Sequence, residues 1–302
     1  GALAGNGKQN YIFGGTKAGT TRLLKVDDIT YSPTMAKQFK TYIIVLLAMV
    51  FWAFSFIWFK EANQTLRPMT IVFARLVLAT VLIVVYLFIT KQFQKIKKGD
   101  FKLFFWLTVC EPFLYFLGES HGLTLVSATV GSVVIATIPI VIAIAAWIFL
   151  KEKLGIVNYL GIALSFIGIL IFILNKEGTF VYNPKGLALL FMAVLSAVGY
   201  GIFLGKLVEN YNPFFIVFMQ NFLGSILFLP IFLISDLPHI NFGEIGTADL
   251  LPIAKLALFA SVGAFALFAM AVKNIGVARA NVFTNFIPVL TAIFSFFILD
   301  EQ

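Results

Sequence analysis

Residues 126–155 read VSATVGSVVIATIPIVIAIAAWIFLKEKLG, an apolar run that contains Pro139 near its middle and ends abruptly at a Lys-Glu-Lys triplet. The same design returns at residues 275–301, IGVARANVFTNFIPVLTAIFSFFILDE, where Pro288 follows Pro139 at an offset of 149 residues. A fixed internal offset indicates a duplicated sequence. In a membrane protein, duplication is typical of transporters that are built from two halves.

The composition indicates an integral membrane protein. Of the 302 residues, 60% are hydrophobic and only 12% are charged, whereas a soluble domain of this size needs a far more charged surface. The net charge of +8 comes from basic residues between apolar runs, which indicates membrane topology rather than a nucleic-acid partner. The single cysteine, Cys110, excludes an intramolecular disulfide, and two histidines exclude a His-rich metal site. Because a glycine-rich phosphate loop is also absent from the sequence, we expect neither a metal nor a cofactor.

Nine apolar runs have the length of a membrane helix, about 20 residues for ~30 Å of hydrocarbon. They predict an all-α protein in the lipid bilayer, and the short connections predict antiparallel neighbours. Twelve Lys and Arg side chains flank the connections on one side and five flank those on the other, which predicts a cytoplasmic N-terminus, in a bacterial inner membrane. The expected helices cover residues 42–59, 68–90, 101–121, 126–150, 156–174, 185–206, 213–234, 251–272 and 277–299.

The offset divides the chain into two repeats of five helices, and an odd number per repeat makes the two halves inverted across the membrane. We expect the first repeat at residues 35–175 and the second at 181–302. Nine helices of a ten-helix plan are expected, because residues 156–174 have no counterpart after Glu301. The natural gene is therefore expected to continue for about twenty apolar residues. Residues 1–34 are polar and glycine-rich, and they predict a disordered tail or a non-native extension.

Several short segments resemble one known family. They are residues 52–55 (WAFS), 73–75 (FAR), 128–153 and 288–301. Through these segments and the duplicated plan, residues 35–302 resemble the drug/metabolite transporter superfamily, as a protein with two EamA-type domains of which the second lacks its last helix. The resemblance implies a carrier of a small-molecule metabolite with a central cavity between its halves. It also implies a peripheral tenth helix that assists dimerisation, so a homodimer is one expected assembly.

Glu111 is the strongest candidate for a functional residue. It lies about ten residues into the run at 101–121, so at 1.5 Å per residue its depth is ~15 Å, near the middle of the bilayer. An ionised carboxylate at that depth costs on the order of 2.5–3.5 kcal/mol, so we expect it to face a cavity or a partner and to exchange a proton during transport. The alternative is a protonated structural residue beside a helix kink at Pro112.

Further candidates are predicted to lie near Glu111. Tyr115 and Glu119 follow it at four-residue steps, which keeps all three on one side of a helix, although Glu119 lying in the outer interface, in contact with water, is an equal alternative. Arg75 is expected to bind an anionic substrate group, to pair with one of the two carboxylates, or to extend toward lipid headgroups. Its counterpart in the second half is the neutral Gln220, so the two halves offer different chemistry.

A second set of candidates comes from other helices. Asn281 and Asn285 form a stripe with Pro288, and a proline leaves a backbone carbonyl free in the preceding turn, which a cavity or ligand can use. Hydrogen bonding between helices is the alternative for this stripe. Trp52 and Tyr200 come from equivalent helices of the two halves, and they either line the cavity or pack in the core.

The predicted function is that of a secondary transporter. It would move a small polar or amphipathic metabolite by alternating access between inverted halves, coupled to protons or driven by the solute gradient. The sequence contains no nucleotide-binding motif. The alternative is a membrane-embedded enzyme acting on a lipid-linked substrate. The lack of clustered His, Cys or Asp at membrane depth argues against an enzyme.

The inverted arrangement predicts that Lys153 and Asp300 lie on opposite sides of the membrane. In a variant without Cys110, a cysteine at either position should react with a membrane-impermeant maleimide from one side only, and the side should differ between the two positions. Labelling of both cysteines from the same side would overturn the inverted repeat.

Overall fold

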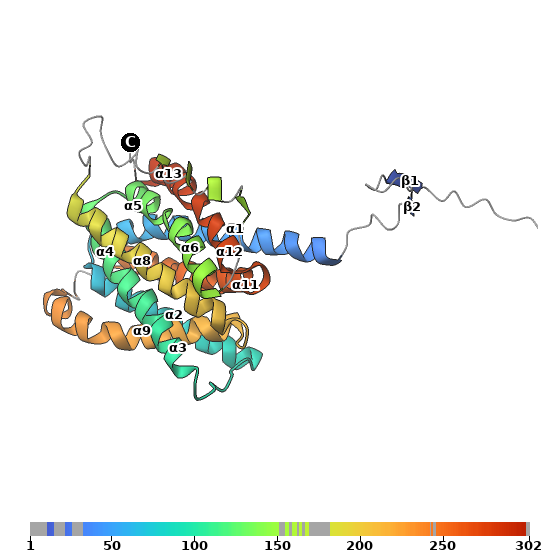
Figure 1. Ribbon diagram of the computed structural model, residues 1–302. Helices are drawn as coiled ribbons and strands as arrows, with labels where there is room; N and C mark the ends of the chain where they lie inside the picture. Colours follow the sequence, from blue (N-terminus) through green and yellow to red (C-terminus); the bar gives the residue numbers. More distant parts are fainter. Residues whose placement is uncertain are drawn as a thin grey trace, which may run out of the picture.

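The computed structural model describes residues 11–14, 22–25, 33–150 and 182–299 except 242, 244 and 245, with scattered positions between 155 and 168. Its main body is a bundle of helices (Figure 1). In chain order the helical elements are α1 (Pro33–Ala62), α2 (Pro68–Thr90), α3 (Phe101–Thr108), the π-helical η2 (Val109–Leu114), α4 (Tyr115–Leu125), α5 (Ala128–Ile135), α6 (Ile138–Leu150), α8 (Pro184–Leu207), α9 (Pro213–Ser235), the 3₁₀ turn η3 (Leu237–His239), α10 (Thr247–Lys255), the π-helical η4 (Leu256–Ala264), α11 (Phe265–Ile275), α12 (Val277–Val282), the 3₁₀ turn η5 (Phe283–Asn285) and α13 (Phe286–Ile298).

Within the described part of the chain, eight helical segments are long and apolar enough to cross a membrane. The all-α membrane fold is thus confirmed, while the helix predicted at residues 156–174 lies mostly outside the described residues. Two predicted helix starts were wrong, since α1 begins at Pro33 rather than at 42 and α10 begins at Thr247 rather than at 251. Both extensions are polar turns that continue a helix beyond the hydrocarbon, so hydropathy does not mark them.

Two short strands, β1 (Tyr11–Gly14) and β2 (Arg22–Lys25), pair antiparallel with each other. The sequence predicted no regular structure in residues 1–34. The ladder is local to this segment and joins none of the membrane helices, so it does not alter the fold of the bundle.

The helices pack in the pattern that two equivalent halves produce. α4 packs against α8 in the way that α11 packs against α1, and α5 and α6 pack against α8 in the way that α13 packs against α1. The pair formed by α2 and α9 joins the corresponding helices of the two halves directly. The exact boundaries of the two repeats remain a prediction.

Polar contacts tie helices together at the end of the bundle where α1 ends, which we call the Lys60 end. The Lys60 ammonium donates a hydrogen bond of 2.6 Å to the carbonyl of Val126, just beyond α4. Asp236, which follows α9, accepts hydrogen bonds from the backbone N–H and the hydroxyl of Thr70 at 2.8 and 3.1 Å. Since Thr70 lies in the first turn of α2, this carboxylate caps the helix and complements its dipole.

The opposite end, which we call the Lys97 end, is tied in an equivalent way. The Lys97 ammonium donates to Oδ1 of Asn210 at 2.9 Å, and Nδ2 of Asn212 donates to Oε1 of Gln92 at 2.8 Å. These bonds join the loop before α3 to the loop before α9. Both ends of the α2–α9 pair are therefore fixed by polar contacts between the two halves.

Four membrane spans are interrupted near their middle. The spans Phe101–Leu125 and Thr247–Ile275 contain the π-helical segments η2 and η4. The span Ala128–Phe149 breaks between α5 and α6, and the span Val277–Ile298 breaks at η5. The last two breaks precede Pro139 and Pro288 by about one turn, because a proline ring clashes with the carbonyl four residues earlier and removes one donor. The matching breaks repeat the duplication seen in the sequence.

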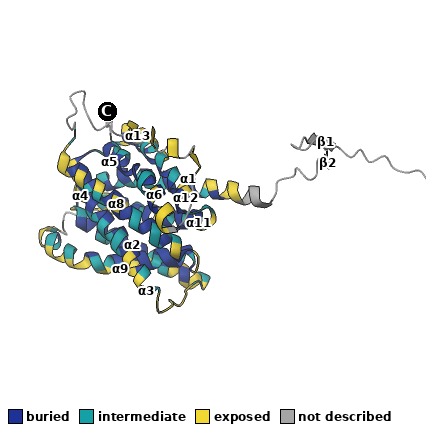
Figure 2. Cartoon of the chain, in the orientation of Figure 1, coloured by how far each residue is buried: buried dark blue, intermediate teal, exposed yellow. Residues whose placement is uncertain are grey.

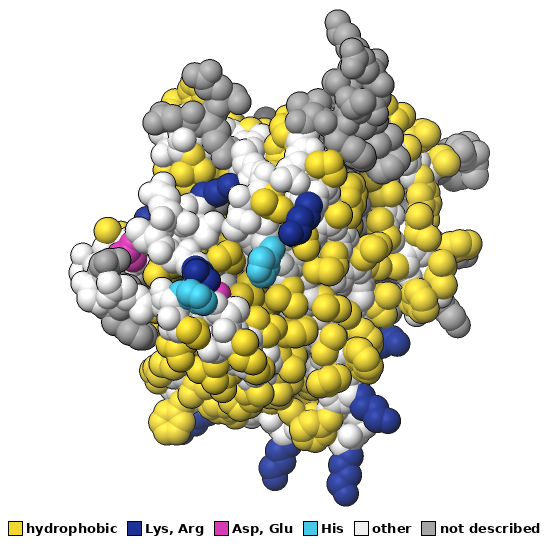
Figure 3. Space-filling view, turned by 90° about the vertical axis from the view of Figure 1, so that its left-hand side faces the viewer, with side chains coloured by type: hydrophobic (Ala, Val, Ile, Leu, Met, Phe, Trp, Pro, Cys, Tyr) yellow, Lys and Arg dark blue, Asp and Glu magenta, His cyan; other side chains and the backbone are white. Residues whose placement is uncertain are grey.

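The surface has the character of a membrane protein. Buried residues gather within the bundle, and the outer faces of the helices are exposed (Figure 2). One face of the molecule shows a broad hydrophobic belt with Lys and Arg side chains at its lower edge (Figure 3). The exposed lysines around the loop at the Lys97 end are Lys91, Lys95, Lys97, Lys98 and Lys102.

Removal of the carboxylate at Asp236 should destabilise the bundle. Asp236→Ala takes away the cap of α2 and leaves the buried Thr70 N–H without its acceptor, so we expect a loss of about 1–2 kcal/mol. Thermal unfolding in detergent measures the effect, with the exposed Glu209→Ala as the control. Equal unfolding midpoints for the two variants would show that the cap is dispensable.

Candidate functional site

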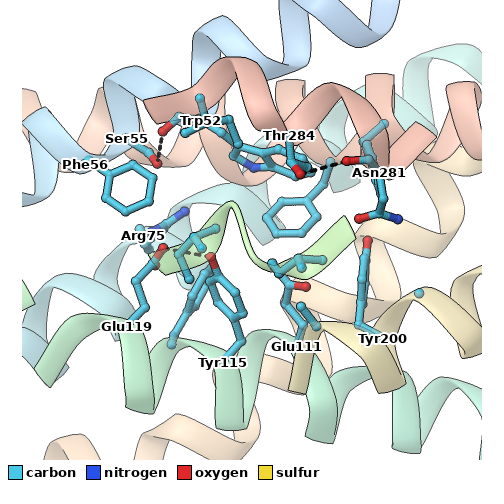
Figure 4. A pocket seen from close by; sticks show the side chains of 18 residues that line it. Trp52, Ser55, Phe56, Arg75, Glu111, Tyr115, Glu119, Tyr200, Asn281 and Thr284 are labelled. Carbon is cyan, nitrogen blue, oxygen red and sulfur yellow. Dashed lines mark hydrogen bonds between the residues drawn. The ribbon is translucent and has the colours of Figure 1, made fainter. Parts of the chain in front are cut away.

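A central cavity lies where the interrupted helices meet. Its volume is about 50 Å³, which is enough for a few water molecules or a small chemical group. Helices from both halves contribute to its wall (Figure 4). The lining residues are Trp52, Ser55, Phe56, Arg75, Glu111, Tyr115, Phe116, Glu119, Ile135, Ile138, Ala197, Tyr200, Gly201, Phe265, Phe268, Asn281, Thr284 and Ile287.

Two carboxyl groups from one broken span face this cavity. Glu111 lies at the break, where its backbone is extended (φ −147°, ψ 119°) and the helix stops before Pro112. Glu119 lies two turns further on, and its Oε1 accepts a hydrogen bond of 3.0 Å from the hydroxyl of Tyr115. The predicted placement of these three residues on one side of the span agrees with the cavity wall. Glu119 is half-buried and lines this cavity.

Arg75 is the one cationic side chain among the lining residues. Its Nε donates to the hydroxyl of Ser261 at 2.9 Å, and its guanidinium carbon lies 4.4 Å from the centre of the Phe116 ring. Neither Glu111 nor Glu119 forms a salt bridge with it within the described structure. Arg75 is 4% exposed, so it does not extend toward headgroups. Its position is set by a hydroxyl and an aromatic face, which leaves the two carboxyl groups unpaired by it.

An aromatic wall covers the side of the cavity formed by α1, α8 and α11. The centre of the Trp52 ring lies 5.2 Å from that of Phe265 and 5.0 Å from that of Phe268. The Tyr200 ring lies 5.9 Å from Phe265, in an edge-to-face arrangement. Trp52 and Tyr200 thus both line the cavity and pack in the core, so the two alternatives from the sequence hold together.

Two predicted site residues do not line the cavity. Gln220 lies behind the wall, where its Oε1 accepts a hydrogen bond of 3.3 Å from the Tyr200 hydroxyl. Asn281 lines the cavity and Asn285 does not. The 3₁₀ turn η5 advances by about 120° per residue instead of 100°, so its three residues turn Asn285 about 60° further from Asn281 than a continuous α-helix would.

Several lining or supporting residues had no direct signal in the sequence. Phe265 and Phe268 belong to an apolar run without a distinctive pattern. Ser261, the partner of Arg75, was also missed. Ser261 is the only hydroxyl residue in the apolar segment LALFASVGA. This could have marked it as a site residue, because polar groups at membrane depth face a cavity or a partner.

Helices pack closely on both sides of the cavity. Toward the Lys60 end, a Cβ at Gly131 would collide with Leu123 and lie 3.5 Å from Phe56. Toward the Lys97 end, a Cβ at Gly201 would lie 2.5 Å from Cδ1 of Ile142 and 3.1 Å from Cγ1 of Val277. The missing side chains of the two glycines let α5 and α8 approach their neighbours this closely.

Comparison with known proteins gives the family. The model of the EamA-like transporter family matches residues 39–174 and again residues 184–302. The chain belongs to the EamA-like transporter family. It is therefore an integral membrane protein and a membrane transporter, and the family implies a small-molecule substrate. The predicted resemblance is confirmed.

The relatives of this EamA-like transporter have a similar length. An uncharacterized transporter of Archaeoglobus fulgidus is 27% identical over 262 residues, which cover 87% of this chain and 91% of that protein. The uncharacterized transporter YetK of Bacillus subtilis is 25% identical, over 75% of this chain and 70% of that protein. A crystal structure of a protein with 14% identity superposes with a TM-score of 0.65, over 87% of this chain and 89% of the other, and shares its fold.

Loss of the Ser261 hydroxyl should destabilise the site. Ser261→Ala leaves the buried Arg75 guanidinium with one hydrogen bond fewer, so we expect a cost of about 1.5–3 kcal/mol. Thermal unfolding in detergent tests this against Ser225→Ala, since the Ser225 hydroxyl donates to the Phe222 carbonyl of its own helix. If the two variants unfold at the same temperature, Ser261 does not hold Arg75.

Proposed function

We propose that this transporter is a secondary carrier that moves a small polar or amphipathic metabolite by alternating access. The observation that carries the proposal is the central cavity, with two carboxyl groups and one guanidinium in its wall. The close packing at Gly131 and Gly201 is proposed to form the two closures that separate a bound solute from the ends of the bundle. Separation of one closure at a time exposes the cavity to one side of the membrane.

The substrate contacts are proposed to come from the polar and aromatic lining. Arg75 offers N–H donors to an anionic group, while Glu111 and Glu119 offer acceptors to an ammonium or hydroxyl group. Trp52 supplies an apolar face, and Asn281 supplies an amide. Tyr115 fixes Glu119 through its hydrogen bond of 3.0 Å. Gln220 and Asn285 are proposed to act from behind the wall.

Coupling to protons is proposed to run through Glu111 and Glu119. Two ionised carboxylates beside one guanidinium leave a net negative charge at membrane depth, where each ionised group costs on the order of 2.5–3.5 kcal/mol. Binding of one proton removes this excess charge, and binding of a positively charged substrate group does the same. A proton and such a group therefore compete for the site, which couples their movements.

The setting of the protein is proposed from the same observations. The Lys97 end and the N-terminus are proposed to lie on the cytoplasmic side of a bacterial inner membrane, and the exposed lysines at that end support this proposal. A homodimer is the proposed assembly. The alternative of an enzyme finds no support in the cavity, because no His, Cys or Asp occurs among its described lining residues.

Glu111→Gln should remove the dependence of transport on pH. The substitution keeps the shape and hydrogen bonding of the side chain but abolishes its titration, so proton-coupled uptake or exchange should fall to background between pH 5 and 9. The measurement is the initial transport rate in proteoliposomes, normalised to inserted protein, with candidate solutes chosen by thermal shift.

The matched control is Glu209→Gln, at an exposed position outside the membrane spans, which should keep the unmodified rate and pH profile. Tyr115→Phe should weaken substrate binding with less effect on coupling. An unchanged pH profile in Glu111→Gln would identify Glu111 as a structural hydrogen-bonding residue.

A further inference from the structure

The buried face of α13 is polar. Its buried residues are Ile287, Thr291 and Ser295, which follow one another at four-residue steps on a single stripe. The rest of the helix exposes large apolar side chains, which suit contact with lipid: Phe286, Val289, Ile293, Phe296, Phe297 and Ile298. α13 thus directs two hydroxyl groups toward the interior of the protein.

These two hydroxyl groups are buried without hydrogen bonds. Thr291 and Ser295 are both 0% exposed, and neither Oγ has a partner among the described residues. Other buried hydroxyls of this protein donate to their own helix, as Thr108 does to the Phe104 carbonyl at 2.9 Å and Ser196 to the Met192 carbonyl at 2.8 Å. An unsatisfied polar group in a protein interior is costly, so this contact of α13 is unfavourable while it remains closed.

The stripe leads from the cavity to the Lys60 end. Ile287 lines the cavity, and at 1.5 Å per residue Thr291 and Ser295 lie about 6 Å and 12 Å beyond it. α13 runs in the same direction as α1, because Phe283 stacks on Tyr42 and Phe294 stacks on Phe54. It therefore ends where α1 ends.

The neighbours of the stripe are α1 and α5, which pack against α13. α5 begins next to Val126, the residue whose carbonyl accepts the Lys60 hydrogen bond. Its Ser132 is also 0% exposed, and its hydroxyl donates to the Thr129 carbonyl at 2.8 Å. We call the contact of α13 with α1 and α5 the hydroxyl seam.

The equivalent seam in the other half is apolar. At the offset of 149 residues, the counterparts of Thr291 and Ser295 are Ile142 and Ala146. Ile142 packs against Gly201 in the closure toward the Lys97 end. The two seams therefore differ in chemistry, since within the described structure only the hydroxyl seam buries hydroxyl groups without partners.

We propose that the hydroxyl seam is the route by which the cavity opens to the Lys60 end, and that Thr291 and Ser295 drive this opening. When the seam parts, water reaches both hydroxyls and satisfies them, so the open state gains hydrogen bonds that the closed state lacks. The substrate then passes along a polar face. This inference rests on the proposed alternating access and assigns its path at one end.

The double variant Thr291→Val with Ser295→Ala tests the seam. It removes both hydroxyls at nearly constant side-chain shape. The closed state then no longer carries the free-energy cost of two buried hydroxyl groups without hydrogen bonds. With Ile287→Cys as reporter in a Cys110→Ala background, labelling by a membrane-impermeant maleimide from the Lys60 side should slow about tenfold. The thermal unfolding midpoint in detergent should rise. Thr291→Ser with Ser295→Thr keeps both hydroxyls and should label at the unmodified rate.

The matched control is Thr108→Val with Ser120→Ala, which removes two buried hydroxyls that donate to carbonyls of their own helices. This variant should unfold at a lower temperature and keep the unmodified labelling rate. If the seam variant also unfolds at a lower temperature, or if its labelling rate is unchanged, the hydroxyls are ordinary packing contacts and the proposal is wrong.

Neither measurement needs a substrate, so the seam and the proposed function can fail separately. Slower labelling in a protein that moves no solute would uphold the seam and overturn the carrier. Unchanged labelling in a protein whose transport depends on Glu111 would uphold the carrier and overturn the seam.

Discussion

The structure depends on one constraint, which is that a peptide group in hydrocarbon must find its hydrogen bond within the protein. Continuous helices meet this demand, and α1, α2, α8 and α9 are continuous. The four spans that break do so in their middle, and residues at or next to the breaks line the cavity, as Glu111, Ile138 and Thr284 do. The non-helical backbone at membrane depth thus lies next to the polar cavity.

The ionisable side chains of the cavity must also find polar partners within the protein. Arg75 is held by a hydroxyl and an aromatic ring rather than by a carboxylate. A salt bridge between Arg75 and Glu119 would neutralise both and leave little for a solute to bind. The structure buries the two groups without a salt bridge between them, which supports the proposal that they bind a ligand.

The sequence predicted the fold well because membrane spans are long and apolar, and the duplication was visible as a fixed offset. Glu111 and Arg75 could be assigned to the interior because their depth within an apolar run requires it. The predicted position of Asn285 in the cavity wall was wrong because a three-residue 3₁₀ turn rotates the helix. The spacing of residues in the sequence does not reveal such a turn. Ser261, Phe265 and Phe268 were missed for another reason, since their roles depend on contacts between helices far apart in the sequence.

The polar ties at both ends of the α2–α9 pair have a mechanical consequence. Thr70 and Asp236 bind these two helices at one end, and Gln92 and Asn212 bind them at the other. Hydrogen bonds at both ends of the pair oppose a change in the position of α2 relative to α9. Because the hydrogen bonds hold the α2–α9 pair at both of its ends, we expect the proposed movement between the halves to occur mainly in the other helices.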